Sequence, residues 1–232
     1  MALFKSSVLA QVSGSLGGLT FSRNRGGLYL RTRRIPVNPG TEDQQTVRGY
    51  FANLASAWAN LTAAQRTAWA TYAANVPVTN RMGDQINLTG QQMFIRNNAA
   101  RMRLGLSAVA SGPTDFSSAT LTLPTTGVNA ADSGLTVQFT EADAWVGEDD
   151  AALGVYISTD KSPATEYHKG PYLLAGAILG DSVTPPTTPD TSLTSPYVHA
   201  DGNSVFLRYI VVMADGRISP VMREGPVTVV TT

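Results

Sequence analysis

The hydrophobic pattern of the chain changes its period twice. Short alternating segments at residues 19–21 and 28–32 are followed by a stretch, 41–104, in which apolar side chains recur at helical spacing. From residue 118 onward the period returns to two. A period of two predicts strands and a period near 3.6 predicts amphipathic helices. The sequence therefore predicts an α+β protein.

This pattern divides the chain into four parts. Glycines, prolines and serines cluster between the periodic segments, where they are typical of turns and linkers. The predicted parts are a basic, glycine-rich arm with a β-hairpin at 1–40, a small helical region at 41–104, a linker at 105–117 and a β-sandwich domain at 118–232.

The arm contains two strand-like segments around a glycine pair. Gly26 and Gly27 lie between residues 19–21 and 28–32 and can supply the positive φ angles of a tight hairpin turn. Pro36 and Pro39 then stop the second strand. A lone hairpin of this length is marginal in water. We therefore expect the arm to order against the rest of the protein or against a neighbour.

Three start signals indicate helices in the second part. Thr41, Thr62 and Thr89 are each followed three residues later by Gln, as in a capping box. The third helix is expected to end near Arg101 and Arg103, whose charges suit the negative end of a helix dipole. The intervening segment 78–88 is predicted as a loop or a β-turn.

Seven or so short strands are predicted in the last part. The strongest is residues 205–213, and Asp215-Gly216 after it is a hairpin-turn signal. About 110 residues with this spacing are typical of an antiparallel β-sandwich of the fibronectin III or immunoglobulin-like kind.

Charge is divided unevenly along a chain whose formal net charge is zero. Residues 1–103 carry twelve Lys and Arg and three acids, a net charge of +9. Residues 104–232 carry five Lys and Arg and fourteen acids, a net charge of −9. Such a division predicts that the basic half docks on something acidic. The candidates are another copy of the same chain, packed head to tail, and nucleic acid.

Composition excludes several classes of protein. The chain contains no cysteine, which rules out disulfides, thiolate metal sites and a cysteine nucleophile. No apolar run approaches the length of a membrane span. The first twenty residues are a poor signal peptide because polar residues interrupt their apolar run. We expect a protein made and kept in a cytoplasm, without a membrane partner.

Motifs for catalysis are weak. The two histidines, His168 and His199, lie in turn-like polar surroundings and are predicted to be exposed loop residues. Glu148, Asp149 and Asp150 could offer oxygen ligands to Ca²⁺, but their spacing is not that of an EF-hand, so a solvated acidic turn is favoured. No nucleophile elbow, phosphate loop or zinc motif occurs. We predict no enzyme activity, no cofactor and no metal.

The arm carries the clearest binding signal. Arginines alternate there with aromatic residues, and no acid occurs among them. By the period of two, Arg23 and Arg25 share one face, as do Arg31 and Arg33. The arm could bind phosphates, clamp an acidic protein surface, or be solvated. The predicted partner-binding residues are Arg23, Arg25, Tyr29, Arg31, Arg33 and Arg34.

Four stretches resemble a family of uncharacterised proteins from environmental tailed bacteriophages and their prophages. They are SGSLGGLTFSRNRGG (13–27), the pattern within RTRRIPVNPGTEDQQTVR (31–48), LTAAQRTAW (61–69) and GQQMFIRNN (90–98). The resemblance covers residues 13–98 well and the predicted sandwich only loosely. It implies a virion structural protein and carries over no functional residue.

Arm, sandwich and resemblance together favour one function over three others. The favoured function is a phage head decoration (cement) protein, a homo-oligomer that binds the major capsid protein through its basic half with the sandwich facing outward. The alternatives are a neck or tail component that forms a ring by head-to-tail packing, a nucleic-acid-binding protein that uses the arm, and a carbohydrate hydrolase, which lacks a convincing carboxylate pair.

Overall fold

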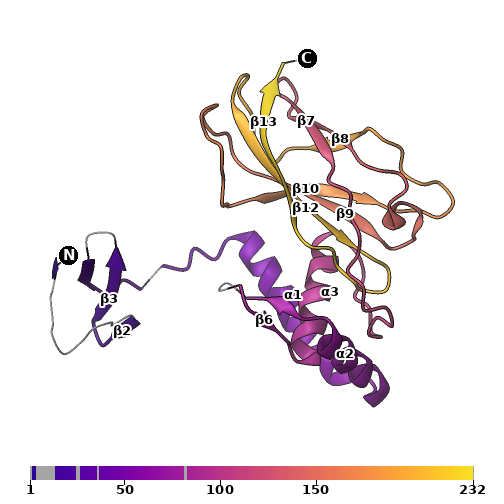
Figure 1. The fold of residues 1–232 in the computed structure, drawn as a ribbon, viewed down its shortest axis with the longest axis horizontal. Helices are drawn as coiled ribbons and strands as arrows, with labels where there is room; N and C mark the ends of the chain where they lie inside the picture. The colour runs from indigo at the N-terminus through magenta and orange to yellow at the C-terminus, as the bar shows by residue number, and fades with distance from the viewer. Residues whose placement is uncertain (1, 4–13, 25–26, 36, 81–82, 232) are drawn as a thin grey trace. The chain divides into compact units, whose positions relative to one another are not determined.

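The computed structural model describes residues 2–3, 14–24, 27–35, 37–80 and 83–231. The chain divides into two compact units, residues 1–42 and 43–232, and each is described by itself. Within the described residues the fold is a mixed α+β arrangement of helices and mostly antiparallel sheets (Figure 1).

The described residues of the first unit form a four-stranded antiparallel sheet. Its strands are β1 (Ala2–Leu3), β2 (Gly14–Leu16), β3 (Leu19–Asn24) and β4 (Gly27–Thr32), in the order β1-β4-β3-β2. The predicted hairpin is confirmed, because β3 pairs with β4 from Leu19 opposite Thr32 to Asn24 opposite Gly27. A second tight turn joins β2 to β3, and Gly17 adopts there a φ of 57° that favours glycine.

Three helices precede the large sheet in the described part of the chain: α1 (Glu42–Asn60), α2 (Ala63–Asn75) and α3 (Gly90–Arg103). Two of the predicted capping boxes are confirmed. The Gln65 amide donates to Thr62 Oγ1 at 3.3 Å, and Gln92 makes the same bond to Thr89. The box at Thr41 stays a prediction. The segment between α2 and α3 forms a small hairpin of β5 (Val78–Thr79) and β6 (Gln85–Ile86).

An aromatic cluster holds the helices together. The rings of Trp69 and Phe94 meet edge to face with their centroids 5.5 Å apart, and Leu54 and Met93 are buried beside them. Edge-to-face packing suits the charge distribution of aromatic rings. Phe51 precedes the buried Leu54 by three residues on α1 and is 49% exposed, so α1 buries only part of its apolar stripe.

The second sheet has seven strands within residues 125–230, all of them described. Neighbours are antiparallel except β13 and β7. In sheet order the strands are β10 (Leu173–Leu179), β9 (Ala152–Ile157), β12 (Ser204–Val212), β13 (Met222–Val230), β7 (Thr125–Asn129), β8 (Gly134–Gln138) and β11 (Asp190–Thr194).

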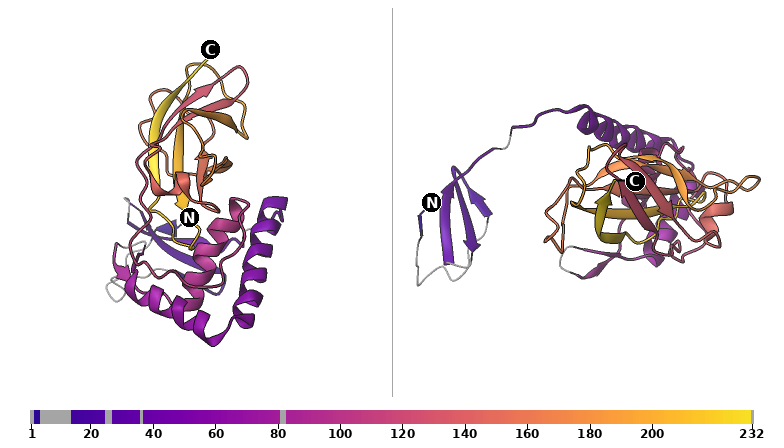
Figure 2. Two further views of the ribbon diagram at one scale, coloured as in Figure 1. Left: turned by 90° about the vertical axis from the view of Figure 1, so that its right-hand side faces the viewer. Right: turned by 90° about the horizontal axis from the view of Figure 1, so that it is seen from above.

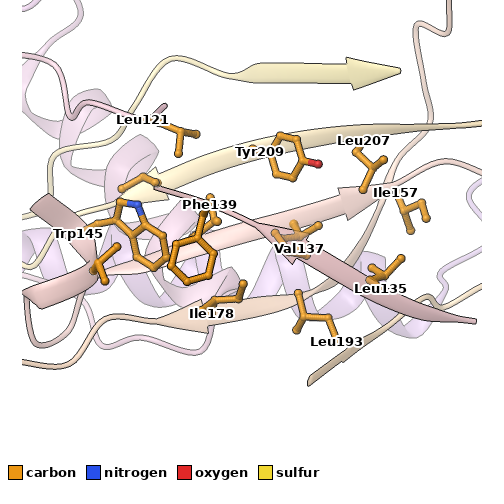
Figure 3. Packing of buried hydrophobic residues seen from close by; sticks show 14 of the residues in the cluster. Leu121, Leu135, Val137, Phe139, Trp145, Ile157, Ile178, Leu193, Leu207 and Tyr209 are labelled. Atoms are coloured by element: carbon orange, nitrogen blue, oxygen red, sulfur yellow. The ribbon is translucent and has the colours of Figure 1, made fainter. Parts of the chain in front are cut away.

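The larger hydrophobic cluster of this sheet lies around Trp145. Trp145, from the short 3-10 helix η1 (Ala144–Gly147), is fully buried with its ring 5.2 Å from that of Phe139 (Figure 3). Val137 of β8 and Leu207 of β12 join the same cluster. Every residue of β9 is buried, which explains its unbroken run of apolar residues.

Buried polar side chains on α3 connect the helices to the sheet. Asn97 donates to the Gly216 carbonyl at 2.9 Å. The fully buried Arg101 donates to the carbonyls of Ser107 at 3.0 Å, Asp150 at 3.1 Å and Met213. A buried guanidinium is stable only when its donors are satisfied. Here carbonyl oxygens from three loops satisfy it, so α3 and the sheet belong to one unit (Figures 1 and 2).

Segment 105–117, predicted as a linker, is tied to the helices. The indole N–H of Trp69 donates to the Ala110 carbonyl at 2.9 Å. Asn98 accepts from the Val109 amide at 2.6 Å and donates back to its carbonyl at 3.2 Å. A side chain on Gly112 would meet the backbone of Trp69 at 2.7 Å, so this close approach requires glycine. The segment is therefore part of the packed structure.

Replacing Arg101 by Met should destabilise the second unit strongly. The change keeps the length of the side chain but leaves three carbonyl groups without this donor, at an expected cost of about 3 kcal/mol in the free energy of unfolding. Arg103→Met, two residues away on the same helix, removes a cation–π contact from an exposed arginine to the Tyr156 ring and should cost less than about 1 kcal/mol. Urea unfolding followed by tryptophan fluorescence measures both. Equal losses would contradict this role for Arg101.

Candidate functional site

The register of the four-stranded sheet sorts its residues onto two faces. Directly opposed residues in neighbouring strands point to the same side of a sheet, and the sides alternate along each strand. One face is mainly apolar and the other mainly polar. The apolar face carries Leu16, Leu19, Phe21, Leu28 and Leu30, together with Arg23; the polar face carries Ser15, Thr20, Ser22, Tyr29 and Arg31.

This sorting separates the predicted partner-binding residues. Tyr29 and Arg31 share the polar face, whereas Arg23, opposite Leu28, lies on the apolar face. Arg33 and Arg34 follow the end of β4 and are exposed, and the Arg33 amide donates to the Gly18 carbonyl at 2.8 Å. Arg25 lies outside the described residues.

The arm combines two kinds of binding surface. Exposed guanidinium groups at Arg23 and Arg31 can each pair with carboxylates or phosphates. Leu16 is 77% exposed and Leu19 41% exposed, so the apolar face retains area that a partner could cover. Because Arg keeps its proton, these guanidinium groups can bind anions but cannot act as general acids or bases.

The prediction that both histidines are exposed is wrong. His168 is half-buried, and its ring lies 5.2 Å from that of Tyr172 and 5.7 Å from that of Phe206. His199 is 4% exposed and lies between the ends of β11 and β12. Polar neighbours in the sequence indicated a surface loop, but they are the hydrogen-bond partners that allow His199 to be buried.

His199 connects a serine to an aspartate. Its Nε2 lies 2.6 Å from Ser195 Oγ, and its Nδ1 bonds to the carboxylate of Asp160, which follows β9. Asp160 also accepts from the Ala200 amide at 2.8 Å and from the Asn203 side chain at 3.0 Å. This network assigns the proton to His199 Nδ1, with the Ser195 hydroxyl donating to Nε2.

Two opposing effects act on the pKa of Asp160. Partial burial raises it, but the bonds donated by Asn203, Ala200 and His199 outweigh burial, so the net pKa is lowered. Its charge is therefore stabilised in the folded state. The carboxylate is a fixed anchor for the loop that contains His199.

The order serine, histidine, aspartate is also that of a nucleophilic relay. A relay needs a hydroxyl that substrate can reach and donors for the developing oxyanion. Ser195 is only 9% exposed, and its Oγ also accepts from the Tyr197 amide at 3.1 Å. A neighbouring cavity of about 330 Å³ is lined by Pro196 with Tyr50 and Leu174. Because the Ser195 hydroxyl is buried and hydrogen-bonded, the geometry favours a structural role. The Ser195–His199–Asp160 contacts, here called the latch, close the loop between β11 and β12.

The acidic loop predicted as a weak calcium candidate has a different arrangement. Asp149 accepts from the amide and hydroxyl of Ser182 at 2.8 and 2.9 Å, and Glu148 accepts from the Ala214 amide at 3.0 Å. Among the described residues, no three acidic, His or Cys side chains converge as a metal site would require. These carboxylates brace neighbouring loops.

A hydrogen-bonded cluster at Tyr209 reinforces the junction of β12, β13 and β7. The Tyr209 hydroxyl bonds to the Glu224 carboxylate and lies 2.6 Å from Thr126 Oγ1. Burial raises the pKa of both Tyr209 and Glu224. Glu224 also accepts from the Thr126 amide at 3.1 Å. Every member of the cluster has a partner within it, which is the pattern of structural support.

Sequence reasoning missed the Ser195–His199–Asp160 contact because its signal is not local. Ser195 and His199 are four residues apart, but Asp160 precedes His199 by 39 positions and meets it only through sheet pairing.

No helix in the described part of the chain has the length and hydropathy to cross a bilayer. Comparison of the chain with protein-family models, curated proteins and solved structures finds no match.

Asp160→Asn should remove a pH-dependent part of the stability. Because the folded-state pKa of Asp160 is depressed, its contribution is present above the unfolded pKa of about 3.9 and is lost as the pH falls through the folded value. We expect the free energy of unfolding of the wild type to exceed that of the variant by about 1–3 kcal/mol at neutral pH. In strong acid the two free energies should converge. Urea titrations across this range measure the difference. Glu166→Gln, in an exposed loop, is the control. If the free energy of unfolding of Asp160→Asn followed the same pH profile as that of the wild type, the anchor role would be contradicted.

Ser195 should not behave as an activated nucleophile. Its hydroxyl is buried in the latch, so a fluorophosphonate probe should modify wild type no faster than Ser195→Ala, as measured by intact-protein mass spectrometry. Labelling mapped to Ser195 and lost in His199→Gln would overturn the latch interpretation and indicate a relay.

Proposed function

We propose that this chain is a non-enzymatic structural protein of a tailed-phage virion, most simply a head decoration (cement) protein. The observation that carries the proposal is the separate arm: the first 42 residues form a unit with a sheet of their own, apart from the unit that contains the helices and the large sheet. A small sheet with an incompletely buried apolar face gains stability when a neighbour covers it. A shell of capsid subunits is such a neighbour.

Charge supports the direction of attachment. Residues 1–42 contain six Lys and Arg and one acid, a net charge of +5, and residues 43–232 carry −5. The arm is thus the part that an acidic capsid surface attracts, and the large unit is the part that it repels. Attachment by the arm therefore directs the large unit outward.

The large sheet suits an outward-facing module. We infer that its strands form a sandwich of the immunoglobulin-like kind. Two features support this: β13 pairs with β12 along most of its length and with β7 at its end, and strands on both sides of β13 contribute to one core. Such domains carry their variable loops at the ends of the strands, away from the core.

A ring-forming neck or tail component is the second candidate. The net charges of +9 on residues 1–103 and −9 on the remainder favour it, because a ring brings unlike ends of successive subunits together. Binding of nucleic acid is a third candidate, supported by Tyr29 and Arg31 on one face. About six arm charges would then give a log–log salt slope of roughly −5.

Quantitative mass spectrometry of purified particles, with heads and tails separated, tests the proposal. We expect many copies, comparable in number to the capsid protein, in the head fraction. Replacing the five arm arginines by Gln should reduce occupancy about tenfold or more, since each exposed ion pair contributes up to about 1 kcal/mol. Neutralising Lys169 and Arg223 in the large unit is the control. Copies confined to tails would support the ring, and absence from both fractions would end the virion proposal.

A further inference from the structure

The apolar face of the arm sheet remains accessible at one end. Leu16 and Leu19 lie opposite each other on β2 and β3 and are 77% and 41% exposed. Ser15 and Thr20, the neighbouring pair, point to the other face, where their hydroxyls lie 2.9 Å apart. At this end of the sheet, hydrophobic attraction therefore acts on the face that carries Leu16 and Leu19.

A complementary surface lies at one end of the seven-stranded sheet, in loops 141–150 and 179–188, here called the acidic end. Hydrogen bonds join the two loops: the Asp181 amide donates to the Val146 carbonyl at 3.1 Å, and the Thr188 amide donates to Glu141 at 3.2 Å. The two loops contain six acids and no Lys or Arg. Leu179 and Val183 among them are 54% and 85% exposed.

The charges of the acidic end are held in place by the fold. Asp181 accepts from the amides of Thr184 and Val183 at 2.8 and 2.7 Å, and these bonds lower its pKa. Asp149 is fixed in the same way on Ser182. A partner therefore meets ordered carboxylates beside exposed aliphatic side chains.

Charge and hydrophobicity match between these two surfaces. Arm residues 14–34 carry five arginines and no acid, against the six acids and no base of the acidic end. We propose that the apolar face of one copy's arm sheet docks on the acidic end of a second copy. This inference rests on the arm being the anchor, as in the proposed function, and names another copy of the chain as one of its partners.

The geometry assigns different roles to arginines that the sequence grouped together. Arg23 lies on the apolar face and enters the contact, while Arg31 lies on the opposite face and stays outside it. The contact joins two different surfaces, so it is heterologous and leaves a free arm and a free acidic end on a pair. Association should therefore continue beyond the dimer as concentration rises.

Matched leucine and serine variants test the face. Sedimentation velocity of the purified full-length chain at low and high salt should show concentration-dependent association of the wild type. Leu16→Asp should weaken it about tenfold or more, whereas Ser15→Asp, with the same added charge on the other face, should weaken it less than about threefold. Leu16 is largely exposed, so its substitution should not disturb folding. A monomeric wild type, or equal effects of the two variants, would overturn the proposal.

Charge reversal tests the partner surface. Arg23→Glu should weaken association about tenfold or more, and Arg31→Glu much less. A variant with Glu141→Lys and Asp150→Asn should also fail to associate alone. Mixed with Arg23→Glu it should recover, because each variant then supplies the surface that the other lacks. Failure of the mixture would refute docking between copies.

The particle assay separates this inference from the proposed function. Suppose that Leu16→Asp and Arg23→Glu do not change the self-association of the purified chain but detach it from heads. The arm then binds another virion protein, so the decoration role holds and self-docking is wrong. If association follows the predicted pattern but the chain is absent from particles, self-docking holds and the virion role is wrong.

Discussion

The structure of the second unit depends on polar groups that are buried on one helix. Asn97, Asn98 and Arg101 lie along α3, and each donates at least one hydrogen bond to a backbone carbonyl of a distant loop or of segment 105–117. Leaving such groups without partners is costly, so the helix and these loops must come together at one position. Apolar contacts would tolerate sliding, whereas fixed donors and acceptors do not.

This constraint explains why the helices and the large sheet form one unit. Leu104, just after α3, packs on Ala152 and Val212, and Gly154 leaves the space that its side chain fills. A side chain on Gly154 would lie 2.6 Å from Leu104. Helices and large sheet accordingly belong to the same compact unit, residues 43–232.

Much of the local structure could be predicted because its causes are local. Alternating residues in the arm and Thr-x-x-Gln boxes at two helix starts act over a few positions, and both are confirmed. The faces of the arm could not be assigned fully because β2 was not recognised. Its three residues, Gly14–Leu16, are too short to show a period.

The latch and the buried arginine could not be predicted because their partners are set by topology. His199 is stable inside the protein because Asp160 lies beside it in the fold. Its neighbours in the sequence are polar, and such neighbours fit a buried histidine as well as an exposed one. The sequence predicts Arg101 as a favourable charge in the last turn of a helix, and Arg101 does lie in the last turn of α3. Its burial depends on carbonyl groups 49 and 112 positions away.

The pairing of the last strand with the first strand of the large sheet has a mechanical consequence. Val229 and Val230 pair in parallel with Val128 and Asn129, and the Ala130 amide adds a bond of 2.8 Å to the Val230 carbonyl. A force that separates the start of β7 from the end of β13 acts along these parallel strands, so their hydrogen bonds are loaded together in shear. Glu224, bonded to Thr126 farther back, adds a side-chain link to the same seam. The pairing of β7 with β13 is thus arranged to resist such a force rather than to open one bond at a time.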